Sequence, residues 1–326
     1  MLLFFTAVFC FFILEIIYFR IADRFNIIDK PNQRSSHSQI TLRGGGILFP
    51  LALIIGVAAF EPGLIYLAFG VFAIAAISFL DDVLTLNNKL RIAVHLVAVL
   101  AILYQVYLST DTSLFLTPFS LLLLIPALIV IIGIINAYNF MDGINGITVL
   151  YSAVAIASIW LIQIRQSVQL LNEDIFCFLL AALAVFGFFN LRKRAKAFAG
   201  DVGSIAMALI LSFLILKLIV ATENLKWILL LGIYGLDAVA TIICRIFRRE
   251  NIFDAHRSHF YQYLANERKW PHVFISAIYA TAQIVLNVCL IYAADELAYT
   301  FFVMLILAYA GIRLIWEGKN RLFKVY

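Results

Sequence analysis

The sequence predicts an all-α protein that crosses a membrane many times. Of its 326 residues, 64% are hydrophobic and 13% are charged, which is about half the charged fraction of an ordinary soluble domain. Apolar runs close to the ~20 residues that a helix needs to cross a bilayer recur along the whole chain. These runs are continuous, whereas the strands of a membrane barrel alternate apolar and polar residues, so we expect helices.

About eleven spanning helices follow from these runs. In chain order they cover residues 2–19, 44–60, 64–80, 90–108, 118–137, 146–165, 174–190, 204–221, 226–244, 273–293 and 298–316. The first run has no Lys or Arg before it and no small-residue cleavage site after it, so we expect an uncleaved span and not a signal peptide. No soluble domain is evident, and residues 1–326 are predicted to form one transmembrane domain.

Lys and Arg divide unequally between the two sets of connections. Of the 24 Lys and Arg residues, all except Arg165, Lys217 and Lys226 fall on one face of the predicted bundle. Because cytoplasmic connections are enriched in Lys and Arg, we expect this face to be cytoplasmic. The N-terminus is then outside and the C-terminus is in the cytoplasm.

The polar clusters of the chain fall on this same predicted cytoplasmic face. They follow the first, third, fifth, seventh and ninth spans, at residues 29–46, 81–90, 136–147, 192–204 and 245–264. The connections on the other face are short and plain. A one-sided distribution predicts a single site at the cytoplasmic surface. An ion-coupled transporter, the alternative of another class, would need polar groups on both faces and across the midplane.

Carboxylates and amides in these clusters suit a metal ion. Asp81 and Asp82 are adjacent acids at a predicted helix end, which is compatible with a solvated boundary, but a divalent cation would relieve their repulsion. The segment NAYNFMDGINGI offers oxygen donors and glycines that permit close approach of a ligand. The donors in this segment are Asn136, Asn139, Asp142 and Asn145.

A further carboxylate, Asp201, lies in FAGDVGS between small residues. Asp and Asn oxygens are hard ligands suited to Mg²⁺. The many Lys and Arg residues of the same face suit phosphate oxygens, although positive charge on that face is general for membrane proteins. Asp81, Asp82, Asn139 and Asp201 are therefore predicted to form a metal–diphosphate site.

Two other clusters leave alternatives open. His256 and His259 have a spacing that Zn²⁺ could use, but no third ligand is evident, and Arg257 between them favours an anionic group. Asp237 lies inside the ninth span, where acids are costly and indicate function. Pairing with Arg245 on the same helix face is its structural alternative. An intramembrane aspartyl protease would need a second deep acid.

Taken together, these segments resemble the polyprenyl-phosphate N-acetylhexosamine-1-phosphate transferases, glycosyl transferase family 4. The family includes the phospho-N-acetylmuramoyl-pentapeptide translocase and the initiators of O-antigen and common-antigen synthesis. The resemblance covers nearly the whole chain, in order. The motifs that carry it are DKPNQRSSH with RGGG, DDVLTLNNKL, NAYNFMDGINGI, FAGDVGS, LDAVATIICRIFRR and HRSHFYQYL.

The resemblance implies a reaction. Undecaprenyl phosphate attacks the β-phosphorus of a UDP-N-acetylhexosamine, UMP leaves, and the lipid carries a sugar diphosphate. Mg²⁺ is the implied cofactor, with Mn²⁺ as a substitute. The implied location is the bacterial inner membrane, with the active site on the cytoplasmic face and the product entering surface-polysaccharide or cell-wall synthesis. No nucleic acid is expected as a partner, and a homodimer is left open.

The resemblance also implies roles for individual residues. Asp201 and Asn139 resemble the metal ligands, and Asp81 and Asp82 resemble the catalytic pair that orients the lipid phosphate or takes its proton. Phe198 resembles the residue that stacks on uracil. The remaining implied substrate-binding residues are Lys89, Asn136, Asp142, Asn145, His256, Arg257 and His259. Asp237 matches a family position whose role is open.

Two departures bear on the donor. His95 stands where the family often has Gln, and the last loop carries HRSH instead of consecutive His. The second departure disfavours the muramoyl-pentapeptide donor. The implied product is an O-antigen or surface-polysaccharide precursor, from a donor that is UDP-N-acetylfucosamine-like or UDP-N-acetylglucosamine. The alternative is UDP-N-acetylglucosamine transfer for common antigen or a wall polymer.

Overall fold

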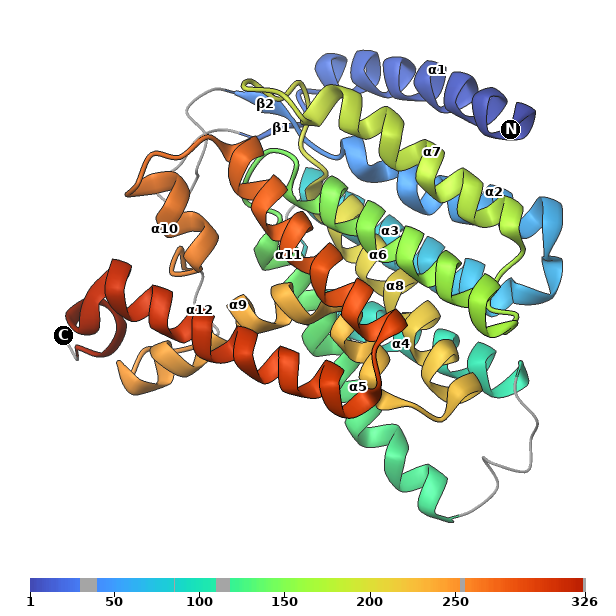
Figure 1. The fold of residues 1–326 in the computed structure, drawn as a ribbon. Helices are drawn as coiled ribbons and strands as arrows, with labels where there is room; N and C mark the ends of the chain where they lie inside the picture. The colour runs from blue at the N-terminus through green and yellow to red at the C-terminus, as the bar shows by residue number, and fades with distance from the viewer. Residues whose placement is uncertain (30–39, 85, 110–117, 253–255, 325–326) are drawn as a thin grey trace.

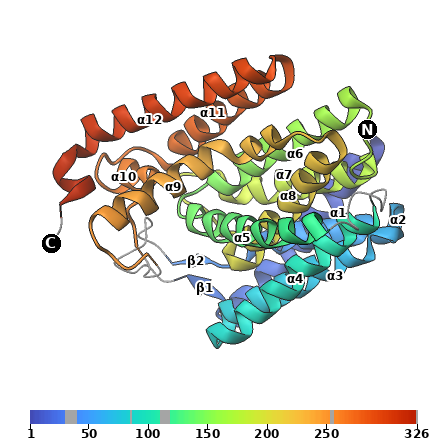
Figure 2. The same ribbon diagram turned by 90° about the horizontal axis from the view of Figure 1, so that it is seen from below.

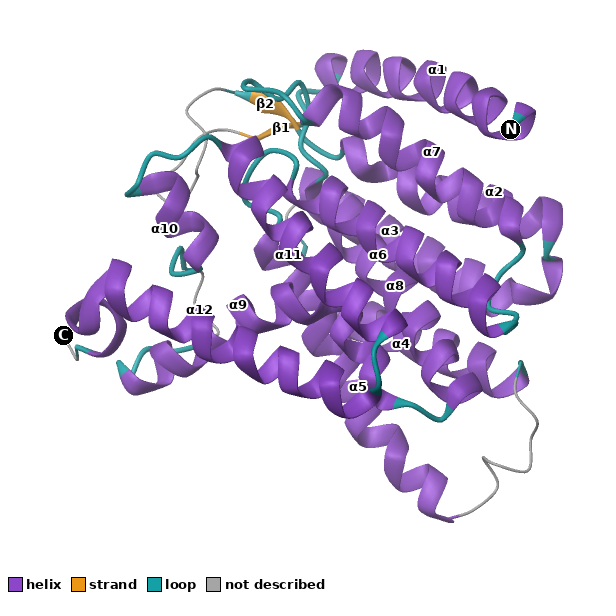
Figure 3. Ribbon diagram, viewed as in Figure 1, coloured by secondary structure: helices purple, strands orange, loops and turns teal. Residues whose placement is uncertain are grey.

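The computed structural model is described here for residues 1–29, 40–84, 86–109, 118–252 and 256–324. Most of the DKPNQRSSH motif therefore lies outside the described residues. Figure 3 shows the described chain as mostly helical, with one short hairpin. The all-α prediction is confirmed. Among the described residues, ten helices are long and apolar enough to cross a membrane.

The first half of the chain forms four helices and a short hairpin. Its elements are α1 (Leu2–Arg24), β1 (Ile28–Asp29), β2 (Thr41–Leu42), η1 (Gly45–Ile47), α2 (Leu48–Phe60), η2 (Pro62–Leu64), α3 (Ile65–Leu84) and α4 (Asn88–Leu108). β1 and β2 pair antiparallel. Asn87 caps α4, since its side chain accepts from the backbone N–H of Lys89 at 2.9 Å, which satisfies a donor left over at the helix start.

The second half of the chain contains α8, the central helix of the bundle. Its elements are α5 (Pro118–Met141), α6 (Ile147–Gln166), α7 (Glu173–Asn190), α8 (Gly200–Thr222), η4 (Leu225–Leu231), α9 (Gly232–Phe247), α10 (Phe260–Asn266), α11 (His272–Tyr292) and α12 (Asp295–Phe323). α8 packs against α2, α3, α4, α5 and α6 and is the most deeply buried of the candidate spans. A helix that is apolar all round and surrounded by others serves as the core of the bundle.

The second predicted span forms a short segment, Gly45–Phe60, in place of a full-length helix. It still joins the two ends of the bundle. Gly46 at its start bonds to Ala199 at 3.1 Å, and Glu61 after its end accepts from the N–H of Asn172 at 2.8 Å. Asn172 caps the start of α7, which returns to the first end.

The two chain termini lie at opposite ends of the bundle, and the C-terminus is on the same side as the β-hairpin and α10 (Figure 1). Figure 2 shows the same hairpin and α10 together at one end. The last predicted span extends further than expected, from Asp295 to Phe323, with a break at Gly318, whose φ is 78°. The short helix α10 was not predicted. The polar segments thus share one end, as the one-sided prediction requires.

Candidate active site at one end of the bundle

Three carboxylates from two helix ends meet two arginines. Asp82 near the end of α3 lies 2.7 Å from Arg43, and Asp201 in the first turn of α8 lies 3.2 Å from the same Nη2 atom. Asp82 also accepts from the backbone N–H of Asp201 at 3.1 Å. The side chain of Asp82 is fully buried, while that of Asp201 is 18% exposed. Two acids far apart in sequence are thereby fixed side by side.

Asp81 joins the same cluster through Arg91. Arg91 lies 2.8 Å from Asp81 and 3.7 Å from Asp201, and Asp81 accepts from the backbone N–H of Leu86 at 2.7 Å. The carboxylates of Asp82 and Asp201 hold the pKa of Arg43 above its usual value, against the lowering effect of its own partial burial. Arg43 and Arg91 were not among the predicted site residues. The RGGG and KLR sequences were the signals available for them.

Glycines bring the RGGG segment against α8. The N–H groups of Gly45 and Gly46 donate to the carbonyls of Phe198 and Ala199 at 2.9 and 3.1 Å. A Cβ on Gly46 would lie 2.5 Å from the Cα of Gly203, closer than atoms can approach. Because the backbones touch here, glycine in both motifs places Arg43 over Asp201.

Gly200 shows the same constraint directly at the acids. Its φ is 70°, in the left-handed region that favours glycine. A Cβ there would lie 2.8 Å from Oδ2 of Asp82. The carboxylate of Asp82 can reach the start of α8 only because this position has no side chain.

Asn139 reaches the same helix start from α5. Its amide nitrogen lies 3.2 Å from Oγ of Ser204, which in turn donates to the carbonyl of Gly200 at 3.0 Å. This orientation leaves the amide oxygen of Asn139 for a ligand beside Asp201. The structure thus brings Asn139 and Asp201 to one helix start, as the metal-site prediction requires.

The side chains present supply only part of the ligands that Mg²⁺ needs. Among the described residues, no group of three or more His, Cys, Asp or Glu side chains is arranged to hold a metal ion. Mg²⁺ in proteins usually takes one or two carboxylates and fills its other positions with water and substrate phosphates. Asp201 and Asn139 fit that pattern, with the remaining ligands from water and substrate.

The remaining polar residues of NAYNFMDGINGI bond to neighbouring protein groups. Asp142 accepts from Thr148 at 2.6 Å, and burial raises the pKa of the Asp142 carboxyl to about 7. Asn145 is buried and donates to the carbonyl of Arg192 at 2.8 Å, so its amide ties this loop to the next. Asn136 is exposed and donates to Ile132 in its own helix at 2.8 Å. Its predicted substrate contact stays a prediction.

The HRSH loop, residues 256–259, lies against the end of α5. The imidazole rings of His256 and His259 lie 5.0 Å apart, and Phe140 lies 5.8 Å from the first ring and 6.4 Å from the second. The hydroxyl of Tyr261 donates to the carbonyl of Phe140 at 2.8 Å. Burial, with further contributions from neighbouring cations, lowers the pKa of His256 to about 4. The two His rings therefore lie beside Phe140, the residue that follows Asn139.

Asp237 takes partners other than the expected Arg245. Its carboxylate lies 3.3 Å from Nδ1 of His259, while Arg245 pairs with Glu250 at 3.0 Å. The deep acid of α9 is therefore connected to the HRSH loop. Sequence spacing suggested a partner on the same helix, but the HRSH loop folds back over α9 and supplies His259 instead.

The comparison with known protein families matches residues 64–219 to the sequence model of glycosyl transferase family 4. This stretch contains Asp81, Asp82, Asn139 and Asp201. Over this stretch the chain is similar to glycosyl transferase family 4. The resemblance inferred from the motifs is confirmed.

Curated relatives of this chain carry related names. It is 28% identical over 257 residues to a probable undecaprenyl-phosphate N-acetylglucosaminyl 1-phosphate transferase of Bacillus subtilis, covering 75% of this chain and 71% of that protein. It is 28% identical over 281 residues to the undecaprenyl-phosphate α-N-acetylglucosaminyl 1-phosphate transferase of Escherichia coli K12, covering 78% and 72%. It is 26% identical over 278 residues to a phospho-N-acetylmuramoyl-pentapeptide-transferase of Listeria welshimeri, covering 76% and 83%.

Three other predicted site residues lie close in sequence to residues already described. Lys89 is exposed in the first turn of α4, two residues before Arg91, and Phe198 is half-buried three residues before Asp201. Arg257 lies between the two His residues. Their predicted contacts with substrate stay predictions.

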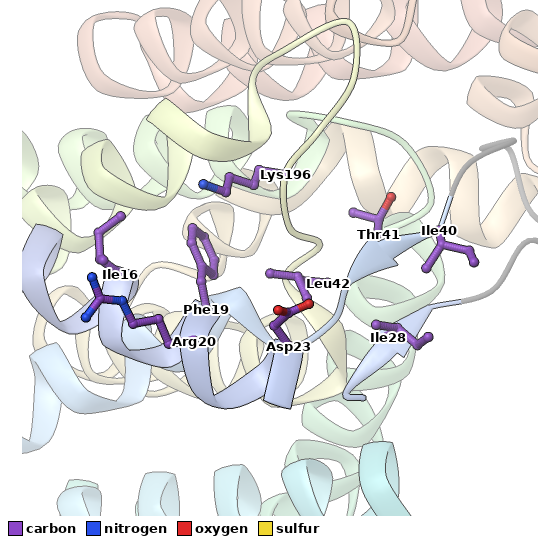
Figure 4. Close-up of a pocket in the computed structure, with 9 residues that line it drawn as sticks. All are labelled: Ile16, Phe19, Arg20, Asp23, Ile28, Ile40, Thr41, Leu42 and Lys196. Atoms are coloured by element: carbon purple, nitrogen blue, oxygen red, sulfur yellow. The ribbon is translucent and has the colours of Figure 1, made fainter. Parts of the chain in front are cut away.

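A cavity of about 550 Å³ opens beside the hairpin, next to the segment that carries Arg43. Figure 4 shows its lining, in which Arg20 and Lys196 flank apolar side chains such as Phe19. No carboxylate of the acid cluster lines it. The cavity neighbours the acid cluster without containing it, so the candidate site is located by its side chains and not by this cavity.

Proposed function

We propose that the protein transfers an N-acetylhexosamine 1-phosphate from a UDP-sugar to undecaprenyl phosphate and releases UMP. The observation that carries this proposal is the acid cluster of Asp81, Asp82 and Asp201, held by Arg43 and Arg91 at one end of a membrane-spanning bundle. A water-soluble nucleotide and a membrane-embedded lipid phosphate can both reach such a place. The names of the relatives support the same class of reaction.

The chemistry requires an oxygen of the lipid phosphate to attack the β-phosphorus of the donor while the bond to UMP breaks. Phosphoryl transfer of this type depends mainly on positioning and on neutralising charge. Asp201 and Asn139 would hold Mg²⁺, which supplies positive charge to the phosphate oxygens when bound. Arg43 and Arg91 present guanidinium groups, whose planar geometry suits phosphate oxygens.

Asp81 and Asp82 are proposed to orient the lipid phosphate. A role as general base is less needed, because a phosphate monoester with a second pKa near ~6 is already mostly dianionic at pH 7. Each of the two acids is held by an arginine, Asp82 at 2.7 Å and Asp81 at 2.8 Å. The two ion pairs keep the arginines next to the place where the phosphates would lie.

The donor is proposed to bind between the acid cluster and the HRSH loop. Phe198 would stack on uracil, and Asp142 and Asn145 would lie near the uridine. Lys89, His256, Arg257 and His259 would hold the diphosphate and sugar. The relatives named for N-acetylglucosaminyl 1-phosphate transfer favour an N-acetylglucosamine-type donor, with an N-acetylfucosamine-like donor as the alternative.

The location and pathway follow from the same proposal. The Arg-rich end would face the cytoplasm of a bacterium, with Mg²⁺ as the cofactor and Mn²⁺ as a substitute. The lipid-linked product would initiate O-antigen or another surface polysaccharide. Common antigen or a wall polymer is the alternative use of the same reaction.

The test is turnover by purified protein in detergent. Undecaprenyl phosphate, Mg²⁺ and a panel of UDP-N-acetyl sugars are supplied, and released UMP is measured with and without EDTA. We expect release that needs the lipid phosphate and the metal, and that is lost in Asp201→Asn. Asp295→Asn is the matched control, because Asp295 pairs with Lys226 at 2.7 Å, away from the acid cluster. Absence of UMP release with every sugar, from folded protein, would favour a transporter.

A further inference from the structure

Asp237 is a buried carboxylate that the proposed reaction does not itself use. Its Oδ1 lies 3.3 Å from Nδ1 of His259 and accepts from the backbone N–H of Phe260 at 3.0 Å. Its Oδ2 accepts from the backbone N–H of Tyr261 at 3.3 Å and from the hydroxyl of Tyr279. One carboxylate on α9 therefore holds the last residue of the HRSH loop and the first two residues of α10.

A second set of contacts braces the same loop from α12. Arg313 donates to the carbonyl of Ser258 at 3.1 Å and to Oγ1 of Thr241 at 3.1 Å. Thr241 in turn lies 3.2 Å from Asp237, and Glu317 forms an ion pair with Arg313. α9, α11 and α12 thus fix the loop by directional bonds, which is more than burial alone would require.

The imidazole of His259 has a different environment at each nitrogen. Nδ1 faces Asp237, whereas Nε2 is buried and has no hydrogen-bond partner among the described residues. The ring stacks on that of His256 and lies near Phe140, which follows Asn139 in the chain. Buried polar atoms are nearly always hydrogen-bonded, so an unpartnered Nε2 in this place indicates a ligand atom.

We propose that Asp237 is a positioning residue that holds the proton on Nδ1 of His259 and directs Nε2 at an anionic oxygen of the donor diphosphate. The proposal rests on the proposed function. A carboxylate that accepts from one ring nitrogen fixes the tautomer and the orientation of the ring. In the doubly protonated ring, Nε2–H donates to the anionic oxygen, and a charge-assisted hydrogen bond of this type is stronger than a neutral one.

A double-mutant cycle tests whether Asp237 acts through His259. Asp237→Asn keeps the side-chain size but removes the charge, and we expect kcat/KM for the UDP-sugar to fall about 10²-fold, as for other misplaced catalytic groups. His259→Gln should cost a similar factor. The double variant should be no worse than the poorer single variant. The KM for undecaprenyl phosphate should stay unchanged. Losses that multiply, or an equal rise in the lipid-phosphate KM, would overturn the proposal.

Tyr279→Phe separates positioning from general damage. It removes one donor to Asp237 but leaves the Asp237–His259 contact. We expect a lower melting temperature with a UDP-sugar kcat/KM within about twofold of wild type, since the loss of one hydrogen bond costs about 1 kcal/mol. A kinetic loss as large as that of Asp237→Asn would show that the cluster acts only through stability.

A readout without turnover keeps this inference distinct from the proposed function. The chain has five His residues, so ¹⁵N-His spectra of the full-length protein can be assigned by the signal missing in His259→Gln. We expect protons on both ring nitrogens of His259 in wild type, with the Nδ1 proton bonded to Asp237, and a change of this pattern in Asp237→Asn. Absence of UMP release from wild type would contradict the proposed function. An unchanged His259 signal in Asp237→Asn would contradict the role of Asp237.

Discussion

Two acidic centres stand within the same end of the protein, and they are built in opposite ways. Asp82 and Asp201 are held by Arg43, whose side chain is 34% exposed. Asp237 is fully buried and is bound by donors from three helices and one loop. The first centre is made of ion pairs to a partly exposed arginine, and the second is made of directional bonds inside protein.

This difference suits the first centre to exchanging ligands and the second to holding a fixed geometry. Ion pairs between solvent-exposed groups contribute only about 0–1 kcal/mol, so Arg43 can leave the partly exposed Asp201 for phosphate oxygens at small cost. Breaking a buried charged network costs about 3–5 kcal/mol, because a charge is left without partners. The exposed centre can therefore change partners during a reaction, whereas the buried centre keeps its geometry.

The largest expected effect comes from Asp82→Asn. Loss of this carboxylate should lower UMP release about 10²- to 10³-fold, the range seen when one preorganised charge-stabilising group is removed. The melting temperature should fall less than in Asp237→Asn, because Arg43 keeps Asp201 as a partner at 3.2 Å. Both are measured on purified protein beside Asp237→Asn, which should lose much more stability. Equal destabilisation by the two variants would remove the distinction between the centres.

A middle effect is expected where the two centres meet, at Gly143. A Cβ there would lie 2.2 Å from the hydroxyl oxygen of Tyr261, so Gly143→Ala should push the HRSH loop away from α5. Overpacking of this type costs about 1–3 kcal/mol, and kcat/KM for the UDP-sugar should fall about 10-fold or more because the His pair moves. Thermal melts and UMP release measure the two losses.

Gly133→Ala is the matched control, because nothing lies within 4 Å of a Cβ at that position on α5, the helix that precedes Gly143. It should keep both stability and activity. Adding Tyr261→Phe to Gly143→Ala removes the clashing oxygen and should restore part of the stability. If Gly143→Ala behaves like Gly133→Ala, the loop is not docked as described.

The sequence predicted the acid cluster well, because spacing within a helical membrane protein limits which ends can meet. Asp81, Asp82 and Asp201 follow apolar runs of spanning length or begin the next one, so their shared face could be inferred. Arg43 and Arg91 were missed as site residues, since positive charge on that face is general and marks no particular contact. The close approach of Gly46 and Gly203 depends on tertiary packing that no local pattern encodes.

The second centre shows the opposite limit. Asp237 was identified as a buried acid, but its expected partner on the same helix face was Arg245, at the i, i+8 position. Its actual partners come from His259 in a loop and Tyr279 on another helix. Helical spacing predicts neighbours within one helix; it carries no information about a loop that folds back over that helix.

The smallest expected effect concerns Asp142, which lies between the two centres. Burial raises its pKa from the ordinary value of 3.8 to about 7, so the folded protein holds a proton that the unfolded chain releases between these values. This contribution to stability is present below about pH 4 and is lost as the pH rises through about 7. Asp142→Asn keeps an acceptor for Thr148 and removes the titration.

Melting temperatures of wild type and Asp142→Asn at about pH 5 and pH 8 measure this effect. The variant should gain stability relative to wild type as the pH rises, by on the order of 1–2 kcal/mol. Glu250→Gln is the contrast, because hydrogen bonds from Arg248 lower the pKa of Glu250, so its loss should give no pH-dependent difference in that range. A wild-type protein that instead gains stability with pH relative to Asp142→Asn would mean that Asp142 is ionised and partnered, like the acids of the first centre.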